Sequence, residues 1–241
     1  MTVNQIMTAQ HIMTELESMG SDSIRNILLK HGVKEPLFGV KIEHLKTIQK
    51  KVKKDYQLAK DLYATGNADA MYLAGLIADD EKMTAADLQT WVRQAVSNNI
   101  SEYTVPWVAA GSPHGYEVAL QWIDSPEEHI AAAGWNTLGN IVALRPDPML
   151  DLPALKTLLT RVTKTVDNAA NRVRYTMNNF VIAVGHYVTA LTPDAIAAAR
   201  KIGSITVDMN GTACKVPDAA AAIQKAADKG TLGKKKKMVK C

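Results

Sequence analysis

The strongest constraint on this chain is the spacing of its apolar residues, which recur three or four positions apart along nearly its whole length. One face of a helix would hold, for example, the apolar residues Val40, Ile42, Leu45, Ile48 and Val52. No strong hairpin signal competes with this pattern, and the only stretch that reads as extended, residues 204–209, is too short to found a sheet. The sequence therefore predicts an all-α protein.

The pattern predicts a series of helices joined by connections of a few residues. They cover residues 4–19, 22–31, 40–52, 56–65, 68–78, 84–98, 102–110, 115–123, 127–144, 151–166, 171–190, 193–202 and 217–228. Taken in pairs, these helices repeat about every 35 to 45 positions, which is the period of HEAT-like or armadillo-like repeats. An ordinary helical bundle gives a similar pattern, but the spacing favours a solenoid, an α-α superhelix of antiparallel helix pairs with a concave face.

A chain of 241 residues needs no disulfide or metal to hold its core, since folding at this size buries roughly 70% of the surface that the unfolded chain exposes. Its two cysteines are too few for a disulfide framework, and no Cys/His group has zinc-ligand spacing. We expect neither a metal site nor a cofactor. We expect one helical-repeat domain over residues 1–230 and a flexible tail over residues 231–241 that carries five lysines.

No run approaches the roughly 20 apolar residues that span a bilayer. The first 20 positions carry Glu15 and Glu17 within an amphipathic pattern, unlike a signal peptide, so we expect a cytoplasmic protein. The net charge of +4 suits a polyanionic partner. Common enzyme classes lose weight, because the sequence has no phosphate-binding glycine loop, dinucleotide fingerprint or serine-nucleophile elbow.

Two groups of basic residues are candidates for phosphate contacts. The first follows the polar face of the helix over residues 40–52 and includes Lys50, Lys53 and Lys54. The alternative for this group is a solvated helix face. The second comprises Arg161, Lys164, Arg172 and Arg174, around the polar start of the helix over residues 171–190. The alternative for the second group is that its side chains cap and bridge neighbouring helices.

The order of three segments, GVKIEHLKTIQKKVKKDYQLAKDLYATGNADAMYLAGLIADD, MTAADLQTWV and SEYTVPWVAA, resembles the DNA alkylation repair family of HEAT-like repeat proteins. The similarity runs from about Gly39 to about Gly185. The resemblance implies a curved solenoid whose basic concave surface holds the phosphate backbone of duplex DNA. It also implies an activity, the removal of cationic alkylated purines by cleavage of the N-glycosidic bond.

The family pairs a tryptophan with an aspartate four residues later, shortly before a Val-Pro step. The resemblance therefore places Glu102 at the carboxylate and Asn98 at the tryptophan. The family's arginine is expected near residues 130–135 and its second tryptophan near residues 178–180, and this chain has neither. The residues that we expect to line a substrate pocket with Glu102 are Tyr103, Trp107, Trp135, Asn178 and Asn179.

A cationic alkylated base is already a good leaving group, so the chemistry needs chiefly a carboxylate to stabilise positive charge on the sugar and to position water. Glu102 is our candidate for that catalytic role, and its alternative is a carboxylate that stabilises the start of a helix. Two functions stay open: a DNA N-glycosylase, or a noncatalytic repeat module that binds DNA structures or a protein partner. If the ligand is duplex DNA, the expected contacts are Lys50, Lys53, Lys54, Arg172 and Arg174.

Overall fold

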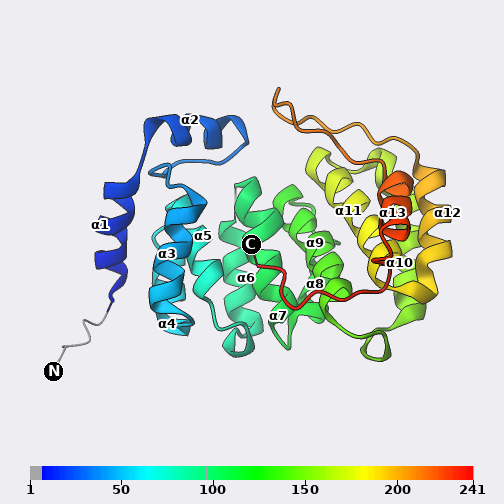
Figure 1. Cartoon of the computed structure of the whole chain (residues 1–241), viewed down its shortest axis with the longest axis horizontal. Coiled ribbons are helices and arrows are strands. Elements are labelled where there is room, and N and C mark those ends of the chain that lie inside the picture. The colour runs from blue at the N-terminus through cyan, green and yellow to red at the C-terminus, as the bar shows by residue number, and fades with distance from the viewer. Residues whose placement is uncertain (1–6, 96, 241) are drawn as a thin grey trace.

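The computed structural model describes residues 7–95 and 97–240, and within them the chain forms a curved array of helices (Figure 1). The expected positions 4–6, 96 and 241 lie outside the described residues. The prediction of an all-α superhelix is confirmed, because the described residues contain helices and no strand. Residues 204–209, which the sequence predicts as extended, form no strand in the described chain: residue 204 lies in a bend and residues 205–209 have no regular secondary structure.

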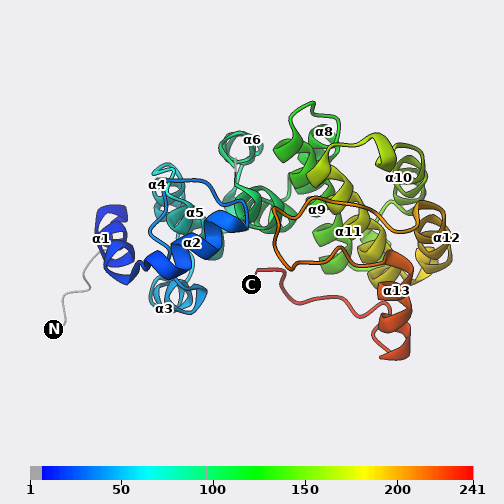
Figure 2. The same ribbon diagram turned by 90° about the horizontal axis from the view of Figure 1, so that it is seen from above.

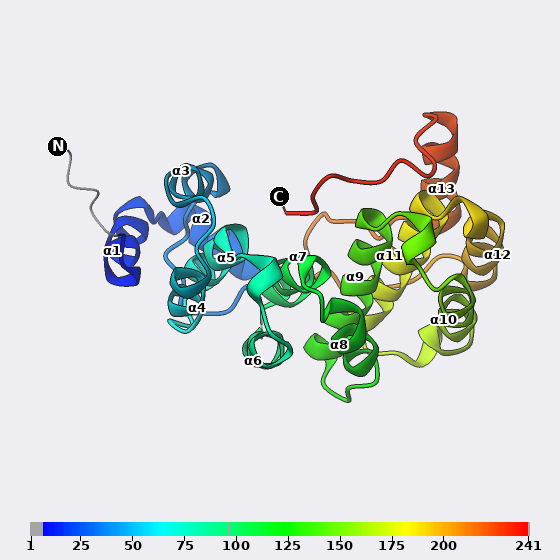
Figure 3. The same cartoon turned by 90° about the horizontal axis from the view of Figure 1, so that it is seen from below.

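The helices form two layers along the array, which Figures 2 and 3 show from opposite ends of the helices. After α1 (Ala9–Met19) and α2 (Asp22–Lys30), the helices nearest the hollow of the curve are α3 (Ile42–Val52), α5 (Ala68–Ile77), α7 (Val105–Gly111), α9 (Glu128–Leu144), α11 (Asn171–Tyr187) and α13 (Ala219–Asp228). The outer helices are α4 (Tyr56–Tyr63), α6 (Ala85–Gln94), α8 (Gly115–Trp122), α10 (Leu152–Thr165) and α12 (Thr192–Ile202).

Short helical turns connect several of these helices. They are η1 (Asp80–Lys82), η2 (Ile100–Thr104), η3 (Asp147–Met149), η4 (Val166–Asn168) and η5 (Thr189–Leu191). Among the described residues no single helix is both long and apolar enough to cross a bilayer. In the described part of the chain, only α11 and α12 taken together reach that length and composition, and they are bent by 114° where they join.

Two hydrophobic cores run along the array and meet at α8 and α9. The first is built from α1 and α3 to α9, and the second from α8 to α13, while α2 packs against a small third cluster of Val33, Leu37 and Ala68. All ten residues of α5 are buried, because this helix lies between α3, α4 and α7. The long central helices α9 and α11 pack along each other. Each helix therefore contacts mainly its neighbours in the array, as expected for a solenoid.

The C-terminal segment leaves α13 and crosses the hollow of the array towards α7 (Figures 1 and 3). Residues 231–240 have no regular secondary structure, but hydrogen bonds join them to α5, α9 and α11. The Gly233 N–H donates to the carbonyl of His186, and the Lys236 N–H donates to the carbonyl of Ala143. The basic tail that the sequence predicts thus lies across the concave face, and its flexibility stays a prediction.

Candidate nucleic-acid interface

A wide helical turn places the predicted carboxylate. Residues Ile100–Thr104 form a π-helical turn, in which the Val105 N–H donates to the carbonyl of Ile100, five residues back. Pro106 follows at the start of α7 and has no N–H to donate. Such turns occur often at functional sites. This one buries Glu102 while leaving the neighbouring Tyr103 42% exposed.

Glu102 forms a two-point ion pair with Arg172, which lies in the first turn of α11. Arg172 Nε and Nη2 donate to the two carboxylate oxygens of Glu102, each at 2.6 Å. The Glu102 side chain is fully buried and the Arg172 side chain is 14% exposed. The guanidinium also lies 4.6 Å from the centre of the Tyr175 ring. Two parallel hydrogen bonds between a guanidinium and a carboxylate are stronger than hydrogen bonds between neutral groups, and they fix the orientation of both side chains.

The environment of this pair acts on Glu102 in two opposing ways. Burial raises the pKa of the Glu102 carboxyl, and the guanidinium of Arg172 works against that rise. The backbone of the same arginine is fixed too, because the Arg172 N–H donates to Glu128 Oε1 at 2.7 Å. The ion pair therefore joins η2 to α11 across two cores and occupies both oxygens of the predicted catalytic group.

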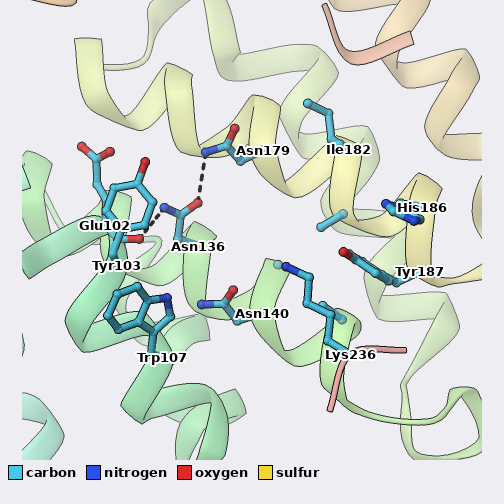
Figure 4. Close-up of a pocket in the computed structure, with 13 residues that line it drawn as sticks. Glu102, Tyr103, Trp107, Asn136, Asn140, Asn179, Ile182, His186, Tyr187 and Lys236 are labelled. Atoms are coloured by element: carbon cyan, nitrogen blue, oxygen red, sulfur yellow. Dashed lines mark hydrogen bonds between the residues drawn. The ribbon is translucent and has the colours of Figure 1, made fainter. Parts of the chain in front are cut away.

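A pocket of about 260 Å³ opens beside this ion pair on the concave face (Figure 4). We call it the asparagine pocket, because Asn136, Asn140 and Asn179 project into it from α9 and α11. Its other lining residues are Glu102, Tyr103, Trp107, Gly139, Ala143, Ile182, Ala183, His186, Tyr187 and Lys236. In Figure 4 the carboxylate of Glu102 points away from the centre of the pocket.

The amides of the asparagine pocket retain hydrogen-bonding capacity. Asn136 Nδ2 donates to the carbonyl of Glu102 at 2.7 Å, while Asn179 Nδ2 reaches Asn136 Oδ1 only at 3.5 Å. Within the described residues the Asn140 amide makes no side-chain hydrogen bond. An amide offers both donors and acceptors, as the edge of a nucleobase does. Trp107 and the exposed Tyr103 add aromatic surface next to these amides.

A second depression, of about 340 Å³, lies where α3, α5 and α7 meet the C-terminal segment. We call it the lysine depression, because Lys53, Lys54, Lys237 and Lys240 line it. It shares Trp107 with the asparagine pocket. Lys53 ends α3 at φ 67°, a conformation that favours glycine. Backbone strain of this kind is concentrated at functional sites.

A third depression, which we call the arginine depression, contains Arg172 and Tyr175. It shares Glu102 and Tyr103 with the asparagine pocket. The three depressions therefore adjoin one another through shared residues, and together we call them the trough. The trough runs from the first turn of α11 to the C-terminal end of α3.

The trough brings together most of the residues that the sequence singled out. Its walls contain Glu102, Tyr103, Trp107, Asn179, Arg172, Lys53 and Lys54. Lys50 is exposed one turn earlier, in the last turn of α3. One member of the second basic group, Arg172, thus shares the hollow with Lys53 and Lys54 of the first, and the role of these residues as phosphate contacts stays a prediction.

Three predicted site residues lie elsewhere. Trp135 is fully buried in the second core, with its ring 5.2 Å from that of Phe180. Asn178 is buried and donates to the carbonyl of Pro217 at 2.8 Å. Arg174 follows Arg172 by two positions, about 200° around the helix, so the two arginines cannot share a face. Trp135 and Asn178 are therefore corrected from pocket residues to packing residues.

The alternative considered for the second basic group is confirmed at two of its members. Arg161 donates to the carbonyl of Ile123 and pairs with Asp124 at 2.7 Å, so it bridges α10 to the end of α8. Arg172 bridges η2 and α11 in the same manner. These arginines use their charges to join neighbouring helices.

The pocket residues in the second half of α9, in the last turn of α11 and in the tail are not among those predicted from the sequence. These residues are Asn136, Asn140, His186, Tyr187 and Lys236. A signal was present, because Asn136, Asn140 and Ala143 stand four and three positions apart on a helix that is otherwise apolar. Polar and small residues at that spacing mark a face that does not pack into the core.

The fold and the trough define a helical-repeat protein with a polar and partly basic concave face. The sequence profile of a family described as "DNA alkylation repair enzyme" matches residues 12–215. The chain belongs to the DNA alkylation repair family, and the resemblance seen in the sequence is confirmed.

Relatives of the whole chain agree with this assignment. The chain is 31% identical over 227 residues to the uncharacterized proteins Lin0241 of Listeria innocua and Lmo0209 of Listeria monocytogenes; each match covers 92% of this chain and 98% of the relative. It is also similar to a solved structure from "a new family of proteins related to the HEAT-like repeat DNA glycosylases with affinity for branched DNA structures". That match has 34% identity and a TM-score of 0.89, and it covers 98% of this chain and all of the other.

Proposed function

We propose that this protein binds branched DNA along the trough, with phosphate contacts at the basic end of α3 and with the asparagine pocket facing the bases. The observation that carries the proposal is the continuity of the trough. Lys53 and Lys54 lie at one end, and aromatic and amide side chains line its middle. The solved relative, described as having affinity for branched DNA, supports the same function for this chain.

Each kind of group in the trough suits a different part of the ligand. Lysines neutralise phosphates without reading sequence, and they release counterions as they do so. Aromatic faces stack on unpaired bases, and amides bond to base edges. Unpaired or strained bases are more accessible at a branch point than in a continuous duplex. A ligand that presents both a backbone and open bases therefore matches the trough better than linear duplex does.

The test compares binding of a four-way junction and of a linear duplex with the same arm sequence, by fluorescence anisotropy at several salt concentrations. We expect the wild-type protein to favour the junction. The triple variant K50Q/K53Q/K54Q should weaken binding to both DNAs and lower the slope of log affinity against log salt by about 2.7, since each phosphate contact contributes about 0.9. Replacing Arg172 is a less direct test, because it also breaks the ion pair with Glu102.

A matched control removes three charges outside the trough. Arg93 on α6 and the pair Arg200 and Lys201 on α12 are exposed and form no ion pair within the described residues. The variant R93Q/R200Q/K201Q should keep nearly the wild-type salt slope apart from the smaller effect of net charge. Equal losses in the two triple variants would show that attraction depends on total charge, and would contradict binding at the end of α3.

A second function, cleavage of the N-glycosidic bond of alkylated purines, is favoured by one observation. Glu102 lies beside Tyr103 and Trp107 at the edge of a pocket, in a chain of the DNA alkylation repair family. The ion pair argues for binding as the main function, because Arg172 neutralises the charge that would stabilise an oxocarbenium ion.

Release of 7-methylguanine and 3-methyladenine from methylated DNA separates the two functions. We expect no release above the rate without protein. Release by the wild-type protein that is lost in Glu102→Gln, with DNA binding intact, would instead assign the catalytic role to Glu102.

A further inference from the structure

The middle of the trough lacks cationic side chains of its own. The segments that line it are α5, η2, α7, α9 and residues 175–187 of α11, and their sequences contain no lysine or arginine. Positive charge from the helices is confined to the end of α3 and the start of α11, where Arg172 is already paired with Glu102. A DNA backbone that follows the trough would therefore find no cation from these inner helices along its central part.

The C-terminal segment crosses this central part. Lys235 Nζ donates to the carbonyl of Val142 at 2.9 Å, near the C-terminal end of α9. Lys240 Nζ donates to the carbonyl of Ala78 at 3.0 Å, at the C-terminal end of α5, and pairs with Asp80 at 2.6 Å. The carbonyl ends of helices carry partial negative charge, so cations are favoured there. Two lysines thus fasten the segment at either side of the middle of the trough.

The two lysines between these anchors remain exposed and point into the trough. Lys236 lines the asparagine pocket, and in Figure 4 its ammonium lies between Asn140 and Tyr187. Lys237 lines the lysine depression, on the other side of Trp107. Neither ammonium forms an ion pair within the described residues. Both lysines are therefore available to phosphates, unlike Lys235 and Lys240.

We propose that residues 234–240 are part of the nucleic-acid surface, with Lys236 and Lys237 as the phosphate contacts of its central part. This inference rests on the proposed function and adds the segment that completes it. The tail then acts as a strap: Lys235 and Lys240 attach it to the protein, and Lys236 and Lys237 face the DNA. A strap fixed in advance loses less conformational entropy on binding than a free basic tail does.

The test measures binding of the same junction and duplex by the double variant K236Q/K237Q. We expect the salt slope to fall by about 1.8 and the affinity at moderate salt to fall roughly tenfold, because two phosphate contacts are lost. The control R200Q/K201Q removes the same charge from α12 and should keep the wild-type slope. Circular dichroism and urea unfolding should show that both variants fold as the wild type does.

A truncation after Gly233 distinguishes a contact from a competitor. If the strap contacts DNA, the truncated protein should bind at least as weakly as K236Q/K237Q. If the truncated protein binds DNA more tightly than the wild type does, the strap occupies the DNA site, and the proposal is overturned. An unchanged slope for K236Q/K237Q would overturn it too, while leaving the proposed function intact. Absence of wild-type binding would remove the proposed function, and this inference with it.

Discussion

Two buried ion pairs join segments that are far apart in the sequence, but they hold different parts of the molecule. Glu102 and Arg172 join η2 to α11, between the first and the second hydrophobic core. Asp80 and Lys240 join η1 to the C-terminal strap, which has no regular secondary structure. The first pair ties the body of the solenoid together, and the second fastens a segment to its surface.

The chemistry of the two cations matches these roles. A guanidinium stays charged at any accessible pH and grips both oxygens of a carboxylate in a fixed plane. A lysine ammonium makes a single-point contact, and burial lowers the pKa of Lys240 and raises that of Asp80. A contact of that kind is easier to open. The comparison teaches that the same pairing of charges can serve as a permanent brace or as a releasable fastening.

Loss of the Glu102–Arg172 ion pair, which we call the brace, should have the largest effect on stability. Arg172→Met leaves the Glu102 carboxyl buried without its partner, which should lower the free energy of unfolding by about 3–5 kcal/mol near neutral pH. The folded-state pKa of Glu102, already raised by burial, should rise further. A raised carboxyl pKa means that the penalty applies above that pKa and shrinks as the pH falls through it. Urea unfolding at pH 8 and pH 5 measures both effects.

A double variant separates the lost pair from the lost packing. Glu102→Leu combined with Arg172→Met replaces both charges by apolar groups of similar size, so it should recover most of the stability. If the double variant is as unstable as Arg172→Met, the loss comes from packing, and the ion pair does not act as the brace described above.

A third ion pair, Lys60–Asp87, lies nearer the surface, and its loss should lower stability less than the loss of Arg172 does. Desolvation raises the pKa of Asp87, but hydrogen bonds from Lys60, Tyr56 and Thr84 outweigh it and lower that pKa to about 2. Asp87 also completes a capping box with Thr84 at the start of α6. Asp87→Asn should cost about 1 kcal/mol at pH 7.

The acid dependence of this third pair has the opposite sign to that of Arg172→Met. A lowered carboxyl pKa contributes stability above the ordinary value and loses it as the pH falls towards about 2. Unfolding of the wild type and of Asp87→Asn from pH 7 to pH 2.5 should therefore converge at the acid end. A constant difference across this range would mean that the charge of Asp87 contributes nothing.

These pairs also show what the sequence could and could not predict. The helices and the solenoid follow from local apolar spacing, and so do caps such as Thr84, because each depends on residues within a few positions. The sequence predicts one helix over residues 102–110, but in the structure a π-helical turn over Ile100–Thr104 precedes α7, which begins at Val105. Local spacing does not report the width of a turn.

The site was harder to predict because its contacts are long-range. Glu102 and Arg172 were both selected, but for separate tasks, since nothing in the sequence pairs residues 70 positions apart. Trp135 was placed in a pocket because it is aromatic, whereas the turn of α9 directs it into the core. The path of the C-terminal segment could not be predicted either. The sequence GKKKKMVKC alone indicates a solvated tail, because the carbonyl groups that Lys235 and Lys240 contact, at the ends of α9 and α5, are far away in the sequence.

Loss of the Asp80–Lys240 ion pair, which we call the fastening, should have the smallest effect on global stability but a clear effect on local opening of the strap. Lys240→Met should change the free energy of unfolding by less than about 1 kcal/mol, because a terminal segment can open while the body stays folded. The same change should speed tryptic cleavage after Lys236 and Lys237, which the attached strap protects. Lys229→Met, at the exposed end of α13, is the matched control. It should leave unchanged both the free energy of unfolding and the rate of cleavage after Lys236 and Lys237. A loss of stability as large as that of Arg172→Met would make the strap part of the brace, and the difference between the two ion pairs would disappear.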